Sequence, residues 1–237
     1  MKKIVLLLIL FSAQIIFAEN INLNITYLGM PAVNVNMAIS DSSLSVSAKS
    51  VSITKMLAKM DNLYEVKFTS TQILPIYYKK IIKQNKYSED RITFYNRKKL
   101  IGSRKSFLTH TSINYKINEE SRDFFSSLLL MRKINGQKHK EIYLDANTRI
   151  WKADLTLVKT ENIATKIGNF ECNKYQIKFK KISHEKKERS DMLTNNLVNE
   201  KGILYFWITN DGRNIPVLAK YSRKPFPVYW KIKSYEN

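Results

Sequence analysis

Apolar and polar residues alternate with a period of two along most of this chain, and this alternation limits the possible fold more than any other feature. The segment "LYEVKFTS" places Tyr64, Val66 and Phe68 on one face. Successive side chains of a β-strand point to opposite faces of a sheet, so the period predicts strands that are buried on one face only. The segments "WKADLTL" and "VYWKIK" have the same period. Half-buried strands of this kind are typical of antiparallel sheets.

The segment "WITNDGRNIPVLAKY" predicts a β-hairpin, because Asp211 and Gly212 can occupy the two positive-φ positions of a type I′ turn. The register of such a hairpin gives three apolar pairs on one face: Ile208 with Ile215, Phe206 with Val217, and Leu204 with Ala219. The opposite face then carries Tyr205, Trp207 and Leu218. The motif is thereby explained by architecture, and we assign no chemistry to it.

A change of apolar phase in "KIGNFECNKYQIKF" predicts a β-bulge. Phe170 and Cys172 fall on even positions, whereas Tyr175 begins an odd series. One extra residue near Asn173 would bring both sets to one face, with a turn at Gly168 before them.

Only the segment "SRDFFSSLLLMRKI" has a clear helical period, with Ser121 or Asp123 as its cap. Its apolar stripe is formed by Phe124, Phe125, Leu128, Leu129 and Met131. Residues 183–202 are charged and polar, and we expect a mobile loop there. The predicted fold class is therefore mainly β: a strongly curved antiparallel sheet or open barrel with one amphipathic helix packed against it.

The first 18 residues have the three parts of a secretory signal peptide: two lysines, an apolar run and a small residue, Ala18. The alternative, a membrane anchor, needs roughly 20 apolar residues, and Ser12 and Gln14 interrupt this segment too early. We expect export to the periplasm, with secretion as the alternative. Residues 19–237 are then a single β-rich domain.

The formal net charge of the chain is +20, or +18 once Lys2 and Lys3 are removed. Such a charge favours anionic partners, including an anionic envelope surface. However, the lysines are spread along the chain and alternate with apolar residues, which is also what a solvated sheet face requires. We interpret "YYKKIIKQNKY" in this way, with its lysines outward, and nucleic acid is disfavoured as a partner. The single cysteine, Cys172, is expected to be buried and reduced.

No catalytic or metal-binding motif is recognisable. The three histidines, His110, His139 and His184, are isolated in the sequence. In "HEKKE" a glutamate stands where a zinc-binding helix needs its second histidine. We interpret the acidic pairs Glu119-Glu120 and Glu89-Asp90 as solvated loop residues, because both sit among polar turn residues and their neighbours do not indicate the apolar pocket that raises a carboxyl pKa. We therefore expect a protein without catalytic residues, metal ligands or cofactor.

The order of several motifs resembles an exported bacterial family called domain of unknown function 3108. These motifs are "YLGMPAV", "LYEVKF", "RDFFSSLLLMRKI", "IGNFEC" and "FWITNDGRNIPVLAKY", and the resemblance covers about residues 27–233. It implies an envelope protein with a curved antiparallel sheet and no established activity. The chain departs from the family at Met30 and Pro31 and in the charged segment that begins at His184.

The expected function is non-catalytic binding of an apolar or amphiphilic envelope component, such as a lipid. The expected binding residues are Phe125 and Leu129 on the helix and Tyr205 and Trp207 on the hairpin. We expect at least one of the two helix residues to face a ligand space between helix and sheet. The alternatives are a structural or protein-interaction scaffold and, third, a polyanion-binding protein. The sequence leaves the oligomeric state open.

We predict that export removes residues 1–18, so that the mature protein begins at Glu19. The intact mass of the protein from the cell envelope checks this. A mass that includes Met1 would show that the leader is retained, and an Ala18→Arg variant should accumulate in the uncleaved form.

Overall fold

Every strand pairs antiparallel with its neighbours, as the alternation predicts. The structure is a computed structural model that describes residues 19–51, 59–85, 87–146, 149–185, 190, 191, 194, 197–222 and 226–237. The predicted signal peptide lies outside the described residues. The strands are β1 (Glu19–Tyr27), β2 (Met30–Ile39), β3 (Ser43–Ser50), β4 (Met60–Phe68), β5 (Pro75–Gln84), β6 (Tyr87–Asn96), β7 (Ile101–Ser106), β8 (Ser112–Lys116), β9 (His139–Ala146), β10 (Arg149–Thr165), β11 (Gly168–Lys181), β12 (Ile203–Thr209), β13 (Pro216–Tyr221) and β14 (Val228–Glu236).

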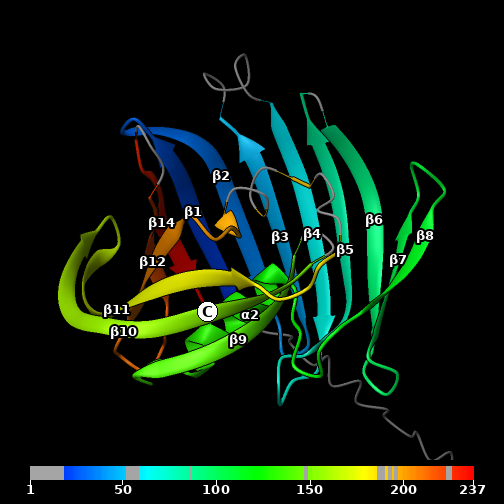
Figure 1. Ribbon diagram of the computed structural model, residues 1–237. Coiled ribbons are helices and arrows are strands. Elements are labelled where there is room, and N and C mark those ends of the chain that lie inside the picture. Colours follow the sequence, from blue (N-terminus) through cyan, green and yellow to red (C-terminus); the bar gives the residue numbers. More distant parts are fainter. Residues whose placement is uncertain are drawn as a thin grey trace, which may run out of the picture.

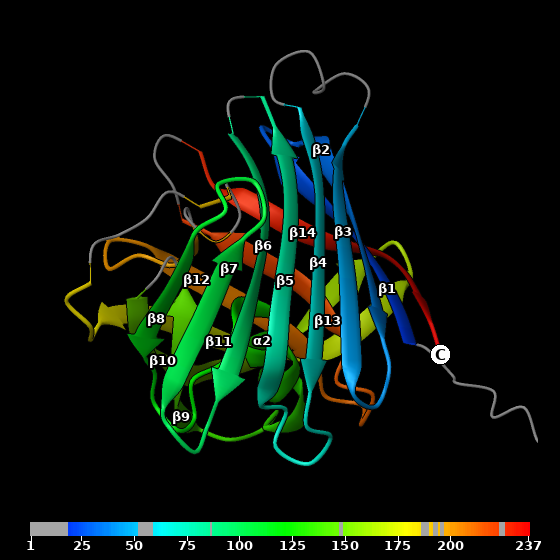
Figure 2. The ribbon, with the colours of Figure 1, turned by 90° about the vertical axis from the view of Figure 1, so that its right-hand side faces the viewer.

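The fourteen strands of the described residues form one sheet, in the order β8-β7-β6-β5-β4-β3-β2-β1-β14-β13-β12-β11-β10-β9. The two edge strands, β8 and β9, follow one another in the chain, with helix α2 (Phe124–Lys133) between them. The sheet curls strongly (Figure 1), so that β9, β10 and β11 cross behind β4 to β7 in the second view (Figure 2). The expected fold class, a curved open sheet with a helix against it, is confirmed.

The inner face of this curved sheet carries the apolar residues that the alternation predicts. Tyr64, Val66 and Phe68 of β4 are 0, 2 and 4% exposed. On β10, Trp151 and Leu155 are likewise buried. Helix α2 lies inside the curve (Figure 2) and covers this face. It is too short to cross a lipid bilayer, and no other helix in the described part of the chain is long and apolar enough to do so.

Helix α2 begins where the sequence predicts, at its cap Asp123. The Asp123 carboxylate accepts hydrogen bonds from the backbone N–H groups of Phe125 and Ser126, at 2.9 and 3.1 Å. Burial raises the pKa of this carboxyl to about 6, although the hydrogen bonds from Ser126 and Phe125 oppose the shift. Phe125 is fully buried, and its ring centroid lies 4.8 Å from that of Tyr64.

The hairpin of β12 and β13 is confirmed, but the predicted turn and register are wrong. Phe206 pairs with Ala219 and not with Val217, because residues 210–215 form a longer connection. Gly212 has a positive φ, as predicted, but the second positive φ is at Asn214. Asp211 does not have a positive φ. Its carboxylate accepts hydrogen bonds from the Arg213 N–H and the Thr209 hydroxyl. The two faces are nevertheless assigned correctly.

The predicted bulge lies on the partner strand. The pairing shifts between Leu157 and Lys159 of β10, so the extra residue is Val158, and β11 runs regularly through Asn173. The turn of this hairpin is formed by residues 166 and 167, two residues before the predicted turn at Gly168 and Asn169. Because β10 and β11 are the longest strands, the hairpin extends past its neighbours and curls round at the left of Figure 1.

We expect Phe125→Ala to lower the free energy of unfolding by about 3–5 kcal/mol, because it removes a fully buried ring that packs on three others. Phe94, which is 49% exposed on β6, is the matched control, and Phe94→Ala should cost less than about 1.5 kcal/mol. Urea unfolding of the two variants measures both values. Similar small losses would mean that α2 is not part of the core.

Candidate functional site

A groove of about 800 Å³ lies on the outer face of the sheet. We call it the outer groove. Its floor is formed by β1, β13 and β14, and its wall by the far end of the β10–β11 hairpin. The floor includes Asn24, Leu218, Tyr229 and Lys231, and the wall includes Ile163 and Lys166.

The strand register explains which residues form the floor. Trp207 pairs with Leu218, Leu218 with Lys231, and Lys231 with Asn24. These residues therefore make one row across β12, β13, β14 and β1 on the outer face. Tyr205 lies on the same face, one row away. The predicted binding residue Trp207 therefore lies beside Leu218 of the floor, but neither Trp207 nor Tyr205 lines the groove itself.

Lysines lie over the aromatic rings of this face. Lys174 Nζ is 5.0 Å from the ring centroid of Tyr205 and 4.9 Å from that of Trp207. The Trp207 indole N–H donates to Glu161 at 2.9 Å. Hydrogen bonds from Lys159 and Trp207 lower the pKa of Glu161, so this carboxylate is ionised and holds the hairpin against the sheet.

The other two predicted binding residues lie on the opposite, inner face. Phe125 is part of the packed core and does not face a ligand space, so the prediction for at least one of the two helix residues depends on Leu129. Between α2 and the sheet, the hollow beside Leu128 has a volume of only about 20 Å³, which holds about one water molecule. Leu129 is 6% exposed and borders a shallow depression of about 260 Å³. The structure therefore does not bring the four residues together.

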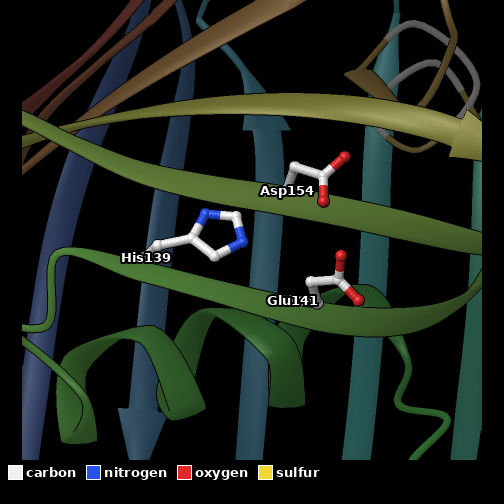
Figure 3. A group of neighbouring side chains, drawn as sticks. All are labelled: His139, Glu141 and Asp154. Atoms are coloured by element: carbon white, nitrogen blue, oxygen red, sulfur yellow. The ribbon is translucent and has the colours of Figure 1, made fainter.

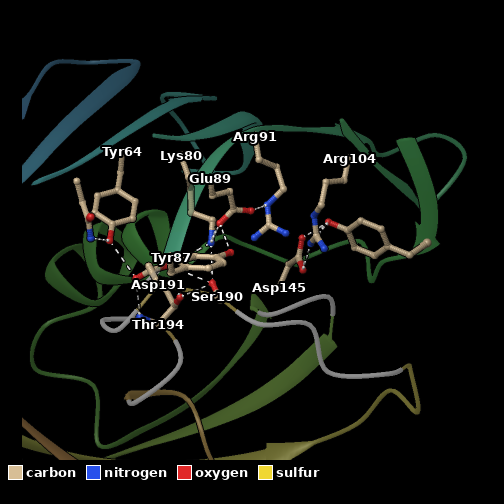
Figure 4. Close-up of polar contacts among 12 residues, drawn as sticks. Tyr64, Lys80, Tyr87, Glu89, Arg91, Arg104, Asp145, Ser190, Asp191 and Thr194 are labelled. Carbon is tan, nitrogen blue, oxygen red and sulfur yellow. Dashed lines mark hydrogen bonds and ion pairs between the residues drawn. The ribbon is translucent and has the colours of Figure 1, made fainter. Parts of the chain in front are cut away.

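The inner face under β4, β5 and β6 carries a buried ionic cluster of Lys80, Glu89, Arg91 and Asp191 (Figure 4). Lys80 Nζ lies 3.2 Å from Asp191 and 3.7 Å from Glu89, and Arg91 Nε contacts Glu89. Lys80 also donates to the Ser190 hydroxyl at 2.8 Å. Burial, and next the charge of Arg91, lower the pKa of Lys80. For Asp191, burial raises the pKa, but Lys80 and the bonds from Thr194 outweigh it and lower it to about 2.

Three sequence interpretations are wrong at this cluster. Lys80 points inward, although we expected outward lysines on this strand, and Glu89 is a buried strand residue rather than a loop residue. Asp191 is fully buried and bonded to Tyr64, which contradicts the expected mobility at this residue. Residues 186–189, 192, 193, 195 and 196 of the predicted loop lie outside the described residues. The signal was weak: Lys80 is in phase with the apolar residues Tyr78 and Ile82 of its own strand.

A second polar contact joins the two edges of the sheet, and we call it the seam. Asp145 of β9 accepts hydrogen bonds from Tyr115 of β8 and, at 3.2 Å, from Tyr95 of β6. Arg104 of β7 lies 3.8 Å from the same carboxylate. The backbone of Arg122 also pairs with β9. Its N–H donates to the Tyr143 carbonyl at 2.9 Å, and its carbonyl accepts the Asp145 N–H at 2.7 Å.

His139, Glu141 and Asp154 come together on β9 and β10 (Figure 3), within 4.8 Å of one another. The sequence alone did not reveal this group, because Asp154 lies on a different strand from His139 and Glu141. Lys152 already forms ion pairs with both carboxylates, at 2.5 Å from Glu141 and 3.5 Å from Asp154. A metal ion would have to displace that ammonium group from an exposed surface, so we do not assign a metal site.

Cys172 is fully buried and has no disulfide, which confirms its expected burial. Burial raises the pKa of its thiol to about 11, with smaller contributions from Asp211 and Glu161. The thiolate is therefore scarce at neutral pH, which disfavours a reactive role. Glu119 and Glu120 are exposed, as expected.

A curved open sheet of fourteen strands around a helix, with a groove on its outer face, defines a β-barrel-like protein. The chain belongs to the family of proteins of unknown function called DUF3108, whose sequence profile matches residues 22–225. This confirms the resemblance. No curated protein matches in sequence.

The fold is similar to that of a β-barrel-like protein of the domain of unknown function DUF1849 from Brucella abortus. The TM-score is 0.59 at 8% identity, over 92% of this chain and 97% of that chain. A protein with a YmcC-like fold from Bacteroides fragilis is 14% identical over 92% of this chain and 95% of that chain. Its TM-score is 0.34, and we draw no argument from it.

We expect Asp191→Asn to lower the free energy of unfolding by about 3 kcal/mol at neutral pH, because it leaves the buried Lys80 charge poorly compensated. The folded pKa of Asp191, about 2, lies below the usual value of about 3.9, so its contribution is present above pH 4 and is lost as the pH falls toward 2. The difference between wild type and variant should therefore narrow over that range in urea unfolding.

The matched control is Asp61→Asn, which removes an exposed ion pair with Lys49 and should cost less than about 1 kcal/mol. A difference between wild type and Asp191→Asn that stays constant down to pH 2 would contradict the assigned ionisation.

Proposed function

We propose that the protein is a non-catalytic binding protein of the cell envelope, and that the outer groove holds the hydrocarbon chain of an anionic amphiphile. The observation that carries this proposal is the lining of the groove. Ile163, Leu218 and Pro31 supply apolar contacts, Lys166 and Lys231 supply positive charge, and none of the described residues that line it is acidic.

The size of the groove supports the same proposal. Its volume of about 800 Å³ lies within the roughly 300–1,000 Å³ that ligand pockets usually have. Lys166 and Lys231 are exposed, so their charged ends reach solvent while their hydrocarbon stems lie along the groove. An anionic head group at the rim and an apolar chain below it match this arrangement.

An exposed apolar patch adjoins one end of the groove, where Gly29 and Pro31 line it. The patch consists of Tyr27, Leu28, Met30 and Phe226, which are 40, 52, 59 and 47% exposed. Contiguous apolar patches on a protein surface often mark sites of interaction with a ligand, a partner or a membrane. We infer that the amphiphile enters from this end.

The envelope location rests on the predicted signal peptide, and the charge of +18 on the remaining residues favours anionic ligands. The tightly filled space between α2 and the sheet favours a second candidate, a structural or protein-interaction scaffold. A scaffold does not need an amphiphile in the outer groove, so the two candidates predict different results in one binding experiment.

We expect dodecyl phosphate to bind at least about tenfold more tightly than dodecyl maltoside, which has the same chain and a neutral head group. Isothermal titration calorimetry below the micelle-forming concentrations measures both affinities. The double variant Lys166→Gln/Lys231→Gln should lose most of this preference, because it removes the positive charge at the rim.

The matched control is Lys67→Gln/Lys83→Gln, which removes two exposed lysines from β4 and β5 and should leave both affinities unchanged. The amphiphile proposal would be wrong, and the scaffold favoured, if neither compound binds. If both double variants lose the preference for dodecyl phosphate to the same extent, the preference arises from the overall charge of the protein and not from the groove.

A further inference from the structure

A second hollow lies on the inner face, next to the ionic cluster and far from the outer groove in the strand order. It has a volume of about 250 Å³ and lies between β6, β7, the connection that follows β7, and β8. We call it the polar pocket. Tyr87, Glu89 and Arg91 of β6 form one wall, and Arg104 and Ser106 of β7 form the next.

The positive charge of this pocket comes from two arginines. Arg91 and Arg104 both line it, and each is 7% exposed. They are diagonal neighbours, because Arg91 pairs with Ser106 and Thr93 with Arg104. Figure 4 shows their guanidinium groups on the same side of the cluster. Of the described residues that line the pocket, only Glu89 is acidic, so its wall carries a net positive charge.

Guanidinium groups are not deprotonated in proteins, so arginine side chains are suited to holding an anion. The lowered pKa of Lys80 agrees with a positive local potential, because Arg91 contributes to that shift after burial. A guanidinium also presents several donors in a plane, so it can hold a cluster carboxylate and still donate to a second oxyanion.

Hydroxyl groups and an apolar rim complete the lining of the pocket. Ser88, Thr109 and Thr111 line the pocket together with Ser106. Leu108 and Ile113 stand at its edge and are 55 and 39% exposed. Hydroxyl groups donate and accept, so they match a ligand that is itself hydroxylated.

We propose that the polar pocket binds a small anionic sugar unit, with Arg91 and Arg104 holding its phosphate or carboxylate group and the hydroxyl side chains contacting its ring. Both arginines also hold the cluster together, because Arg91 contacts Glu89, and Arg104 contacts Asp145 and the Tyr115 hydroxyl. These contacts place both guanidinium groups along a hollow of about 250 Å³ that hydroxyl groups also line.

This proposal does not depend on the outer groove. The groove is lined by β1, β2, β10, β13 and β14 on the outer face, whereas the polar pocket is lined by β6, β7, β8 and the connection between β7 and β8 on the inner face. Loss of amphiphile binding and loss of sugar binding can therefore be measured separately in one variant.

The test is isothermal titration calorimetry with glucose 6-phosphate, glucose and inorganic phosphate at low ionic strength. We expect glucose 6-phosphate to bind most tightly and glucose at least about tenfold more weakly, because glucose lacks the anion. Ser106→Asp places a carboxylate beside Arg91 on the neighbouring strand. It should weaken the binding of glucose 6-phosphate by about tenfold or more. Ser106 accepts a backbone N–H from Thr109, and an aspartate can do the same, so folding should be retained.

The matched control is Ser112→Asp on β8, an exposed residue that does not line the pocket. It should leave the affinity within about twofold of wild type. The proposal is overturned if glucose 6-phosphate does not bind, or if the two aspartate variants weaken it equally, which would indicate attraction to general surface charge. Equal affinity for inorganic phosphate and glucose 6-phosphate would overturn the assigned sugar contacts.

Discussion

The seam at Asp145 is the contact on which the shape of the protein depends. A sheet of fourteen strands has two edges, and unpaired edges expose backbone groups that can pair with other chains. Here β9 is partly paired by Arg122, and its Asp145 carboxylate accepts the Tyr115 hydroxyl from β8. Because the edges meet through side chains, the sheet encloses an interior that its own residues must fill.

Two kinds of side chain fill that interior. Near β9 and β10, helix α2 supplies Phe124, Leu128 and Met131, and almost no space is left. Near β5 to β7 the fill is ionic, with Lys80 and Asp191 in direct contact. Buried charges are tolerated when each has a partner, and here positive and negative groups alternate. This division between apolar and ionic filling explains why the hollow beside β6 and β7, the polar pocket, has a polar lining.

The sequence was sufficient for properties that depend on local periodicity. The alternation around Tyr64 predicted the strands, and Asp123 predicted the start of the helix, because both signals lie within a few residues. It was insufficient where distant residues decide the outcome. Lys80 looks like a surface lysine until Asp191, more than a hundred positions later, is placed beside it. The groove could not be predicted, because it needs the far end of one hairpin beside the outer face of β1.

The bulge at Val158 connects the sequence of β10 to the composition of the groove. Before the bulge, the outer face of β10 carries polar residues such as Asp154 and Thr156, as expected of a solvated face. The extra residue shifts the alternation by one, so that Ile163 and Thr165 share the outer face with Glu161 beyond it. Without this shift Ile163 would point away from the groove wall. The feature that looks like an interruption of the strand is therefore what gives the outer groove its apolar side.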